Sequence, residues 1–336
     1  PTTGIEVQCI GDAHIANFGI FASPTRHLVF DVTTSTKPRP DLGNGTSSAS
    51  LRASRSAVAT RFSKHDRRDA VRACAKQYRT SMKRFTQMGE LDVWYAHLDV
   101  EQAIDTAEKE LGGKTARTIR RAVEKAREKD NLRAADKLTY RIGDTLRFDA
   151  HPPELVPFGD LLETQGYTDG EALFTALQEM LEDYRLSLAP DRRALLDRYR
   201  VLDGARKVVG VGSVGTRAWV VLLAGKDADD PLVLQVKEAG ESVVERFWHA
   251  APYAHHGQRV VEGQRLVQST SDILLGWTGI ESPDGTRRDY YVRQLWNGKG
   301  SIDLEEIGVG SLEQWDAVRA CARSRPRRTG DEALSP

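Results

Sequence analysis

The stretch GDAHIANFG, close to the start of the chain, places Asp12, His14 and Asn17 within one short loop. An Asp and an Asn five residues apart occur in kinase catalytic loops, where the Asp orients or deprotonates an acceptor hydroxyl and the Asn helps to hold a divalent metal. In this hypothesis Asp12 is the catalytic residue, His14 supports it, and Asn17 is a metal ligand. A capped turn whose polar side chains satisfy one another is the alternative. A metal-hydrolase site lacks support, because no second His/Asp cluster at ligand spacing accompanies the loop.

A second motif lies far along the chain in VGVGSVGTRAWVV, where Gly210, Gly212 and Gly215 form a G-x-G-x-x-G pattern. A dinucleotide fingerprint opens a helix after its third glycine, but the following TRAWVVLL is apolar and β-branched and predicts a strand. A Gly-rich turn between two strands is typical of the loop that covers nucleotide phosphates in kinases. Glycines that serve only a hairpin turn are the alternative.

Two charged residues follow this motif in kinase order. Lys237 lies inside the apolar strand LVLQVKEA, and Glu262 lies 25 residues later on a helix predicted in RVVEGQRLVQ. A buried ammonium needs an anionic partner, which nucleotide phosphates and the glutamate would provide. The alternative places Lys237 on an edge strand facing solvent and Glu262 on the surface. The order of glycines, lysine and glutamate favours a nucleotide site, with ATP and Mg²⁺ as cofactors and an unknown phosphate acceptor as substrate.

The elements that must position these residues change in character along the chain. Helical periodicity dominates the first part, and alternating apolar residues dominate from about residue 199. The predicted strands are Ile5–Ile10, His27–Val32, several after residue 199, and 288–296; the predicted helices cover about 64–88, 100–136, 171–188 and 260–269. We therefore expect a mostly helical region over 1–195, an antiparallel-sheet region over 196–300 and a helical tail over 301–336.

Composition limits the classes of partner. The chain has 336 residues with 48 basic and 48 acidic side chains, so no global charge favours nucleic acid or an anionic membrane. Three scattered cysteines fit a reducing compartment, and no apolar run approaches the roughly 20 residues of a membrane span. We expect a cytoplasmic protein that binds neither nucleic acid nor membrane. Because the chain begins with Pro1 rather than Met, we also expect a missing upstream segment.

Several long blocks resemble one bacterial family, the domain-of-unknown-function family 2252. They are TGIEVQCIGDAHIANFGIFASPTRHLVFDV, LDVWYAHLD, VVGVGSVGTRAWVVLL, LQVKEA and RVVEGQRLVQSTSDILLGWT with RDYYVRQLWNGKGS. The resemblance implies an α+β, protein-kinase-like two-lobe fold in circularly permuted order. The helical lobe with the catalytic-loop motif comes first, and the antiparallel-sheet lobe with the Gly-rich loop comes second. The motifs are also similar to those of aminoglycoside phosphotransferases.

The chain departs from this family directly after LVFDV. Where the family reads approximately N-D-F-D-E, this chain has Thr33–Lys37, so Thr34 and Thr36 replace the expected acidic metal ligands. Codons for N-D-F-D-E read one base later give T-T-S-T-K, and those for G-P-W-E-W-D-V-K-R-L give the ten residues Asp41–Ser50. We interpret residues 33–56 as a compensated frameshift and expect them to be irregular. Asp31 survives as a possible metal ligand if its side chain faces the site.

These observations lead to three hypotheses for function. The first is an ATP-binding phosphotransferase fold whose turnover is impaired, because a hydroxyl replaces a carboxylate poorly in the Mg²⁺ shell. The second is a non-catalytic binding or regulatory module that uses the same fold for a protein partner. The third is a poorly folded pseudogene product, because the replaced segment would have packed as a helix in the family.

Overall fold

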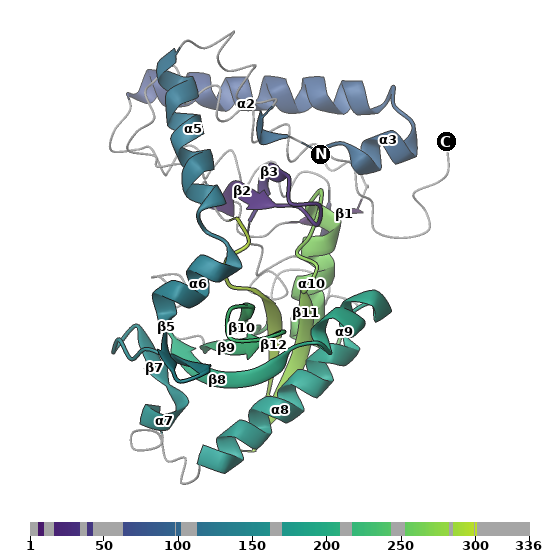
Figure 1. Ribbon diagram of the computed structural model, residues 1–336. Helices are drawn as coiled ribbons and strands as arrows, with labels where there is room; N and C mark the ends of the chain where they lie inside the picture. The colour runs from purple at the N-terminus through teal and green to yellow at the C-terminus, as the bar shows by residue number, and fades with distance from the viewer. Residues whose placement is uncertain are drawn as a thin grey trace.

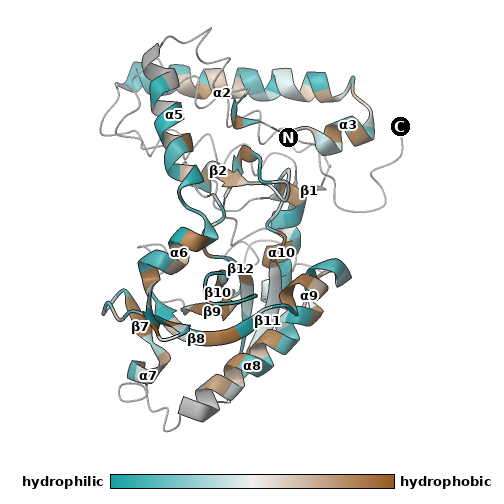
Figure 2. Cartoon of the chain, in the orientation of Figure 1, coloured by the Kyte–Doolittle hydropathy of each residue, from teal (hydrophilic) through white to brown (hydrophobic). Residues whose placement is uncertain are grey.

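The computed structural model describes residues 6–9, 17–33, 39–42, 63–97, 99–101, 113–161, 170–208, 217–242, 253–281, 285–298 and 300. Helices and antiparallel strands are both abundant in it, which confirms the α+β class (Figure 1). Within the described residues, no helix has the length and apolar character needed to cross a bilayer. Apolar residues concentrate on the strands of the main sheet, whereas α5 (Gly113–Arg127) is largely hydrophilic (Figure 2).

A small hairpin near the start of the chain is formed by β2 (Phe18–Ala22) and β3 (Leu28–Val32). Its turn includes Arg26, whose positive φ of 67° places this non-glycine residue in the left-handed region. One face of the hairpin buries alternate residues against α5 in a cluster that includes Phe30, Val32 and Ala126. Because strand residues alternate between faces, Asp31 points to the opposite side.

A separate two-stranded sheet joins β1 (Glu6–Cys9) to β4 (Arg39–Leu42) in antiparallel register. The predicted strands at 5–10 and 27–32 are thus confirmed as β1 and β3, but they belong to different sheets. Residues 33–56 were expected to be irregular, and four of them form β4. Residues 34–38 and 43–56 lie outside the described residues.

The helices of the first region follow local capping signals. Helix α2 (Lys64–Phe85) begins with a capping box between Ser63 and Asp66, and the short α3 (Glu90–Tyr95) follows it. The helix expected over 64–88 is therefore confirmed. Residues 102–112 of the block expected over 100–136 lie outside the described residues. From residue 113 on, the block is divided into α5 and α6 (Asn131–Leu138), and the side chain of Asp130 caps α6 by accepting the N–H of Arg133.

The main sheet has six antiparallel strands in the order β11-β12-β10-β9-β8-β7. Consecutive strands β8, β9 and β10 are neighbours, whereas β11 and β12 form a hairpin that joins β10 through β12. The bounds are β7 (Leu155–Pro157), β8 (Arg200–Lys207), β9 (Ala218–Ala224), β10 (Pro231–Glu238), β11 (Gly276–Glu281) and β12 (Arg287–Gln294). The sheet takes its edge strand β7 from before residue 196.

Both faces of this sheet are covered. On one face, Leu234, Val236 and Val292 pack against Tyr184 of α8 (Gly170–Leu186) and against Leu196 of α9 (Pro190–Leu196). The other face meets α6, the β5 (Thr139–Ile142) and β6 (Thr145–Phe148) hairpin, and α10 (His256–Val267). A four-residue helix, α7 (Phe158–Leu161), follows β7. The helices predicted at 171–188 and 260–269 are confirmed as α8 and α10.

Candidate functional site

Lys237 lies near the end of β10, in the middle of the main sheet. It stands opposite Ala218 on β9 and Tyr291 on β12, so all three side chains share the face that α10 covers. The side chain is half-buried. Burial, reinforced by the positive charge of Arg293, lowers the pKa of Lys237 from 10.5 to about 8. No carboxylate among the described residues forms an ion pair with it. The alternative of an edge-strand lysine is excluded, because β10 is paired on both sides.

Glu262 lies on α10, which packs on the same face through Val260 and Val261. Its carboxylate is 2.9 Å from the guanidinium of Arg265, one helical turn further on. Arg265 also donates a hydrogen bond of 2.8 Å to the carbonyl of Leu275, the residue before β11. The structure therefore brings the predicted glutamate to the same side of the sheet as Lys237 but pairs it with Arg265.

The N-terminus of α10 is attached to the start of β12. Asp289 accepts the backbone N–H of His256 at 2.7 Å, and its other oxygen is 3.3 Å from Nε2 of His255. Nδ1 of His255 accepts the N–H of Gln258 and so caps the helix. The pKa of His255 is lowered by burial, which outweighs the opposing effect of Asp289. These contacts give His255 a structural role at the helix end.

The C-terminus of α10 is attached to the hairpin strand that carries Asp31. The Oδ2 atom of Asp31 accepts the backbone N–H of Ser269 at 2.7 Å, and Gln268 donates its side-chain amide to the carbonyl of Val32 at 2.7 Å. The Oδ1 atom of Asp31 accepts the N–H of Val32 at 2.8 Å, and the side chain is 0% exposed. Asp31 thus faces the helix that carries Glu262, and both of its oxygens already accept backbone hydrogen bonds.

Asn17 and Thr33 flank the hairpin and connect it to the sheet. The carbonyl of Asn17 accepts both the N–H of Thr33 at 2.8 Å and its hydroxyl at 3.3 Å. The carbonyl of Thr33 in turn accepts a hydrogen bond of 2.9 Å from Nη1 of Arg293 on β12. The predicted metal ligand Asn17 is therefore joined to the main sheet through one intermediate residue, Thr33, which contacts Arg293 of β12.

Arg293 was not singled out from the sequence, although the structure places it at the centre of this contact. It stands opposite Gln235 in the register of β10 and β12, and its Nη2 atom is 3.5 Å from Oε1 of that buried amide. The available signal was a charged residue inside the apolar strand RDYYVRQLW, the same signal that marked Lys237.

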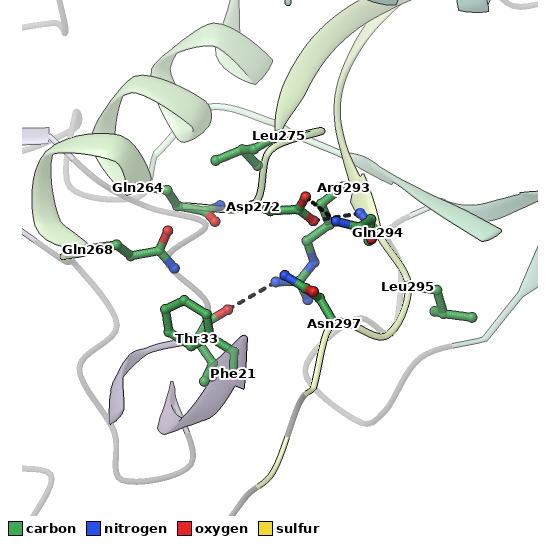
Figure 3. Close-up of a pocket in the computed structure, with 10 residues that line it drawn as sticks. All are labelled: Phe21, Thr33, Gln264, Gln268, Asp272, Leu275, Arg293, Gln294, Leu295 and Asn297. Atoms are coloured by element: carbon green, nitrogen blue, oxygen red, sulfur yellow. Dashed lines mark hydrogen bonds between the residues drawn. The ribbon is translucent and has the colours of Figure 1, made fainter. Parts of the chain in front are cut away.

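A small cavity of about 40 Å³ lies between the hairpin, α10 and β12 (Figure 3). Such a volume holds about one water molecule. The carboxylate of Asp272 at its wall accepts three hydrogen bonds of 2.7 to 2.9 Å, two from Gln294 and one from Leu274. The lining residues are Phe21, Thr33, Gln264, Gln268, Asp272, Leu275, Arg293, Gln294, Leu295 and Asn297. The cavity is a packing gap where these elements meet, and it is too small for a nucleotide.

The remaining predicted site residues lie outside the described residues, namely Asp12, His14, Gly210, Gly212 and Gly215, as do the replaced positions Thr34 and Thr36. The strands on either side of the glycines are described, and β8 and β9 pair as neighbours up to Arg206 and Trp219. The Gly-rich segment therefore connects two adjacent antiparallel strands. In the described part of the chain, no group of three or more His, Cys, Asp or Glu side chains is placed to hold a metal.

Comparison with known proteins gives one family. The profile of the family described as "Uncharacterized protein conserved in bacteria (DUF2252)" matches residues 1–329. No curated protein and no solved structure matches the chain. Since the match covers nearly the whole sequence, the chain belongs to the bacterial DUF2252 family.

Proposed function

We propose that this chain has a kinase-like fold that binds ATP on the face of the main sheet that carries Lys237. The observation that carries the proposal is the order of elements around Lys237. Two adjacent strands joined by a Gly-rich segment are followed by the Lys237 strand, the Glu262 helix and a final hairpin, with the helix on the lysine face. Protein kinases use this order of Gly-rich loop, strand lysine and helix glutamate to hold nucleotide phosphates.

In this proposal the two lobes occur in permuted order along the chain. The hairpin with Asn17 and Asp31 lies against the end of α10, although more than two hundred residues separate them in sequence. Asp12 would be the base for the acceptor hydroxyl, with His14 supporting it, and Gly210, Gly212 and Gly215 would cover the phosphates.

Mg²⁺ fits the remaining residues only in part. Asn17 and Asp31 would hold it through oxygen atoms, where it would neutralise phosphate charge. However, Asp31 is enclosed and accepts two backbone N–H groups, and it supplies only one formal negative charge. The family's acidic positions are Thr34 and Thr36 in this chain. We therefore propose that nucleotide binding persists while phosphoryl transfer is impaired.

Isothermal titration with Mg·ATP tests the proposal. We expect Lys237→Ala to weaken binding about tenfold or more, equivalent to about 1.4 kcal/mol. Lys226→Ala is the matched control, because Lys226 is exposed in the turn between β9 and β10 and should bind as the parent does. Absence of heat with the parent chain, or equal affinity of the Lys237 variant, would exclude the nucleotide site.

One observation favours a non-catalytic binding module as the second candidate, namely the pairing of Glu262 with Arg265 instead of Lys237. A kinase needs the lysine–glutamate pair in place for activity. If turnover is prevented only by the loss of the acidic metal ligands, the double variant Thr34→Asp/Thr36→Asp will consume ATP. Adding Asp12→Asn to this double variant will abolish its ATP consumption. If neither change alters ATP consumption while ATP still binds, the module is the better description.

A further inference from the structure

We propose that Arg293 and Lys237 together form a polyphosphate-binding site that works without a divalent cation. The inference deepens the proposed function, since it concerns the same face of the sheet. It adds a second cationic residue and removes the requirement for metal in binding. It would apply to a nucleoside triphosphate or to an inorganic polyphosphate chain, which present the same charged oxygens.

The backbone register brings the two cations together. Lys237 stands opposite Tyr291, and two residues along the strands Gln235 stands opposite Arg293, so all four side chains emerge on one face. The positive charge of Arg293 contributes to the lowered pKa of Lys237, which fits this proximity. The two cations belong to neighbouring strands in the centre of a sheet, a rigid frame for a charged ligand.

Hydrogen-bonding capacity on this face is not used up. The guanidinium of Arg293 donates to the carbonyl of Thr33 and reaches the amide of Gln235, but its Nε atom is buried and has no partner among the described residues. The hydroxyl of Tyr291, a residue 1% exposed, is also buried without a partner in the described part of the chain. These two atoms show that the polar groups on this face do not fully satisfy one another within the described residues.

The charge on this face is also uncompensated. Across the described residues, neither Lys237 nor Arg293 has a carboxylate within ion-pair distance. Glu262 forms an ion pair with Arg265, and Asp272 accepts hydrogen bonds from Gln294 and Leu274. Two neighbouring cations without a counter-ion repel each other, and a ligand with several negative charges removes that repulsion.

The two side chains are chemically suited to phosphate oxygens. A guanidinium presents a planar fork that matches two oxygens, and an ammonium acts as a point charge. Mg²⁺ ordinarily supplies part of the charge that balances a triphosphate. In this chain Arg293 would supply that charge instead, which fits the replacement of the acidic residues that would otherwise hold the metal.

The test is a titration of the parent chain with inorganic tripolyphosphate and, separately, with ATP, each in excess EDTA. We expect both to bind, and we expect Arg293→Gln to weaken each about tenfold or more. Arg293→Lys keeps the positive charge but loses the planar guanidinium, so its affinity should lie between those of the parent chain and Arg293→Gln. The matched control is Arg287→Gln, because Arg287 is an exposed arginine of the same strand.

The outcomes separate this inference from the proposed function. Binding of Mg·ATP with no binding of either ligand in EDTA would overturn the metal-free site and leave the nucleotide site standing. Binding of tripolyphosphate but not of ATP would support the anion site and exclude the nucleotide. If Arg293→Gln does not fold, as judged by its thermal unfolding, Arg293→Lys and Lys237→Met carry the test. Unchanged affinity in both of these variants would refute the inference.

Discussion

The backbone N–H of Ser269 donates to the carboxylate of Asp31 at 2.7 Å and so joins residues 238 positions apart in sequence. Together with the contact between Gln268 and Val32, this bond holds the end of α10 against the N-terminal hairpin. The helix that carries Glu262 is therefore positioned by a residue that sequence reasoning associates with metal binding.

Asp31→Asn tests the structural part of this role. The amide has one acceptor oxygen, so it cannot accept the N–H groups of both Val32 and Ser269 as the carboxylate does. Leaving one buried donor unpaired should lower the free energy of unfolding by roughly 1–3 kcal/mol, measured by urea denaturation. Asp144→Asn, in the exposed turn between β5 and β6, is the control and should be neutral. Equal stability of the two variants would contradict the assignment.

Lys237 makes stability depend on pH in the alkaline range. Its pKa is about 8 in the folded chain against 10.5 for the unfolded chain. Between these values the unfolded state binds more protons, so the free energy of unfolding rises with pH. Below pH 8 the charged form is destabilising by an amount of order 3 kcal/mol.

Lys237→Met removes this titration without removing the bulk of the side chain. We expect the variant to be more stable than the parent chain at pH 7.5 and the difference to disappear as the pH approaches 10.5. Denaturation at the two pH values, in buffer free of phosphate and other polyanions, measures the effect. A difference that stays constant with pH would show that the burial of Lys237 is not linked to its charge.

Gly257 allows α10 to lie close to β12. A Cβ atom at this position would be 2.2 Å from the carbonyl oxygen of Tyr290, a backbone atom that cannot move independently. Gly257→Ala should therefore displace the helix and cost about 1–3 kcal/mol. Gly159→Ala is a matched control, because nothing lies within 4 Å of its Cβ position. Thermal unfolding of both variants would decide, and a neutral Gly257→Ala would refute the close approach.

The altered segment after Val32 gives a prediction about the gene. If residues 33–56 arise from a compensated frameshift, the nucleotide sequence across codons 30 to 60 contains two opposing insertions or deletions relative to other family members. Resequencing the gene and aligning it with those of other members measures this directly. An unbroken reading frame that aligns without gaps would refute the frameshift and leave Thr34 and Thr36 as ordinary substitutions.

Much of the sheet region was predictable from sequence because its signals are local. The apolar alternation of β9 and β10, the glycines between strands and the periodicity of α10 each appear within about ten residues. The order of these patterns along the chain predicted a strand for Lys237 and a following helix for Glu262, as β10 and α10 show. The α+β class follows from the same patterns.

The pairings that involve distant residues were not predictable. Sequence shows both that Glu262 has Arg265 three residues away and that Lys237 precedes it, but only packing decides which cation it contacts. Arg293 was not predicted as a site residue, because its role depends on contacts with Gln235 and with the carbonyl of Thr33, both distant in sequence. The pairing of β1 with β4 was also missed, since backbone hydrogen bonds between strands leave little trace in side-chain pattern.

The attachment of α10 at both ends limits how it can move. Asp289 fixes its first turn to the sheet, and Asp31 fixes the residue just beyond its last turn to the hairpin. Because hydrogen bonds hold both ends of α10, the helix cannot move outward as a rigid body without breaking one of these bonds. Any exchange of Glu262 between Arg265 and another cation would then proceed by rotation about side-chain bonds instead of by displacement of the helix.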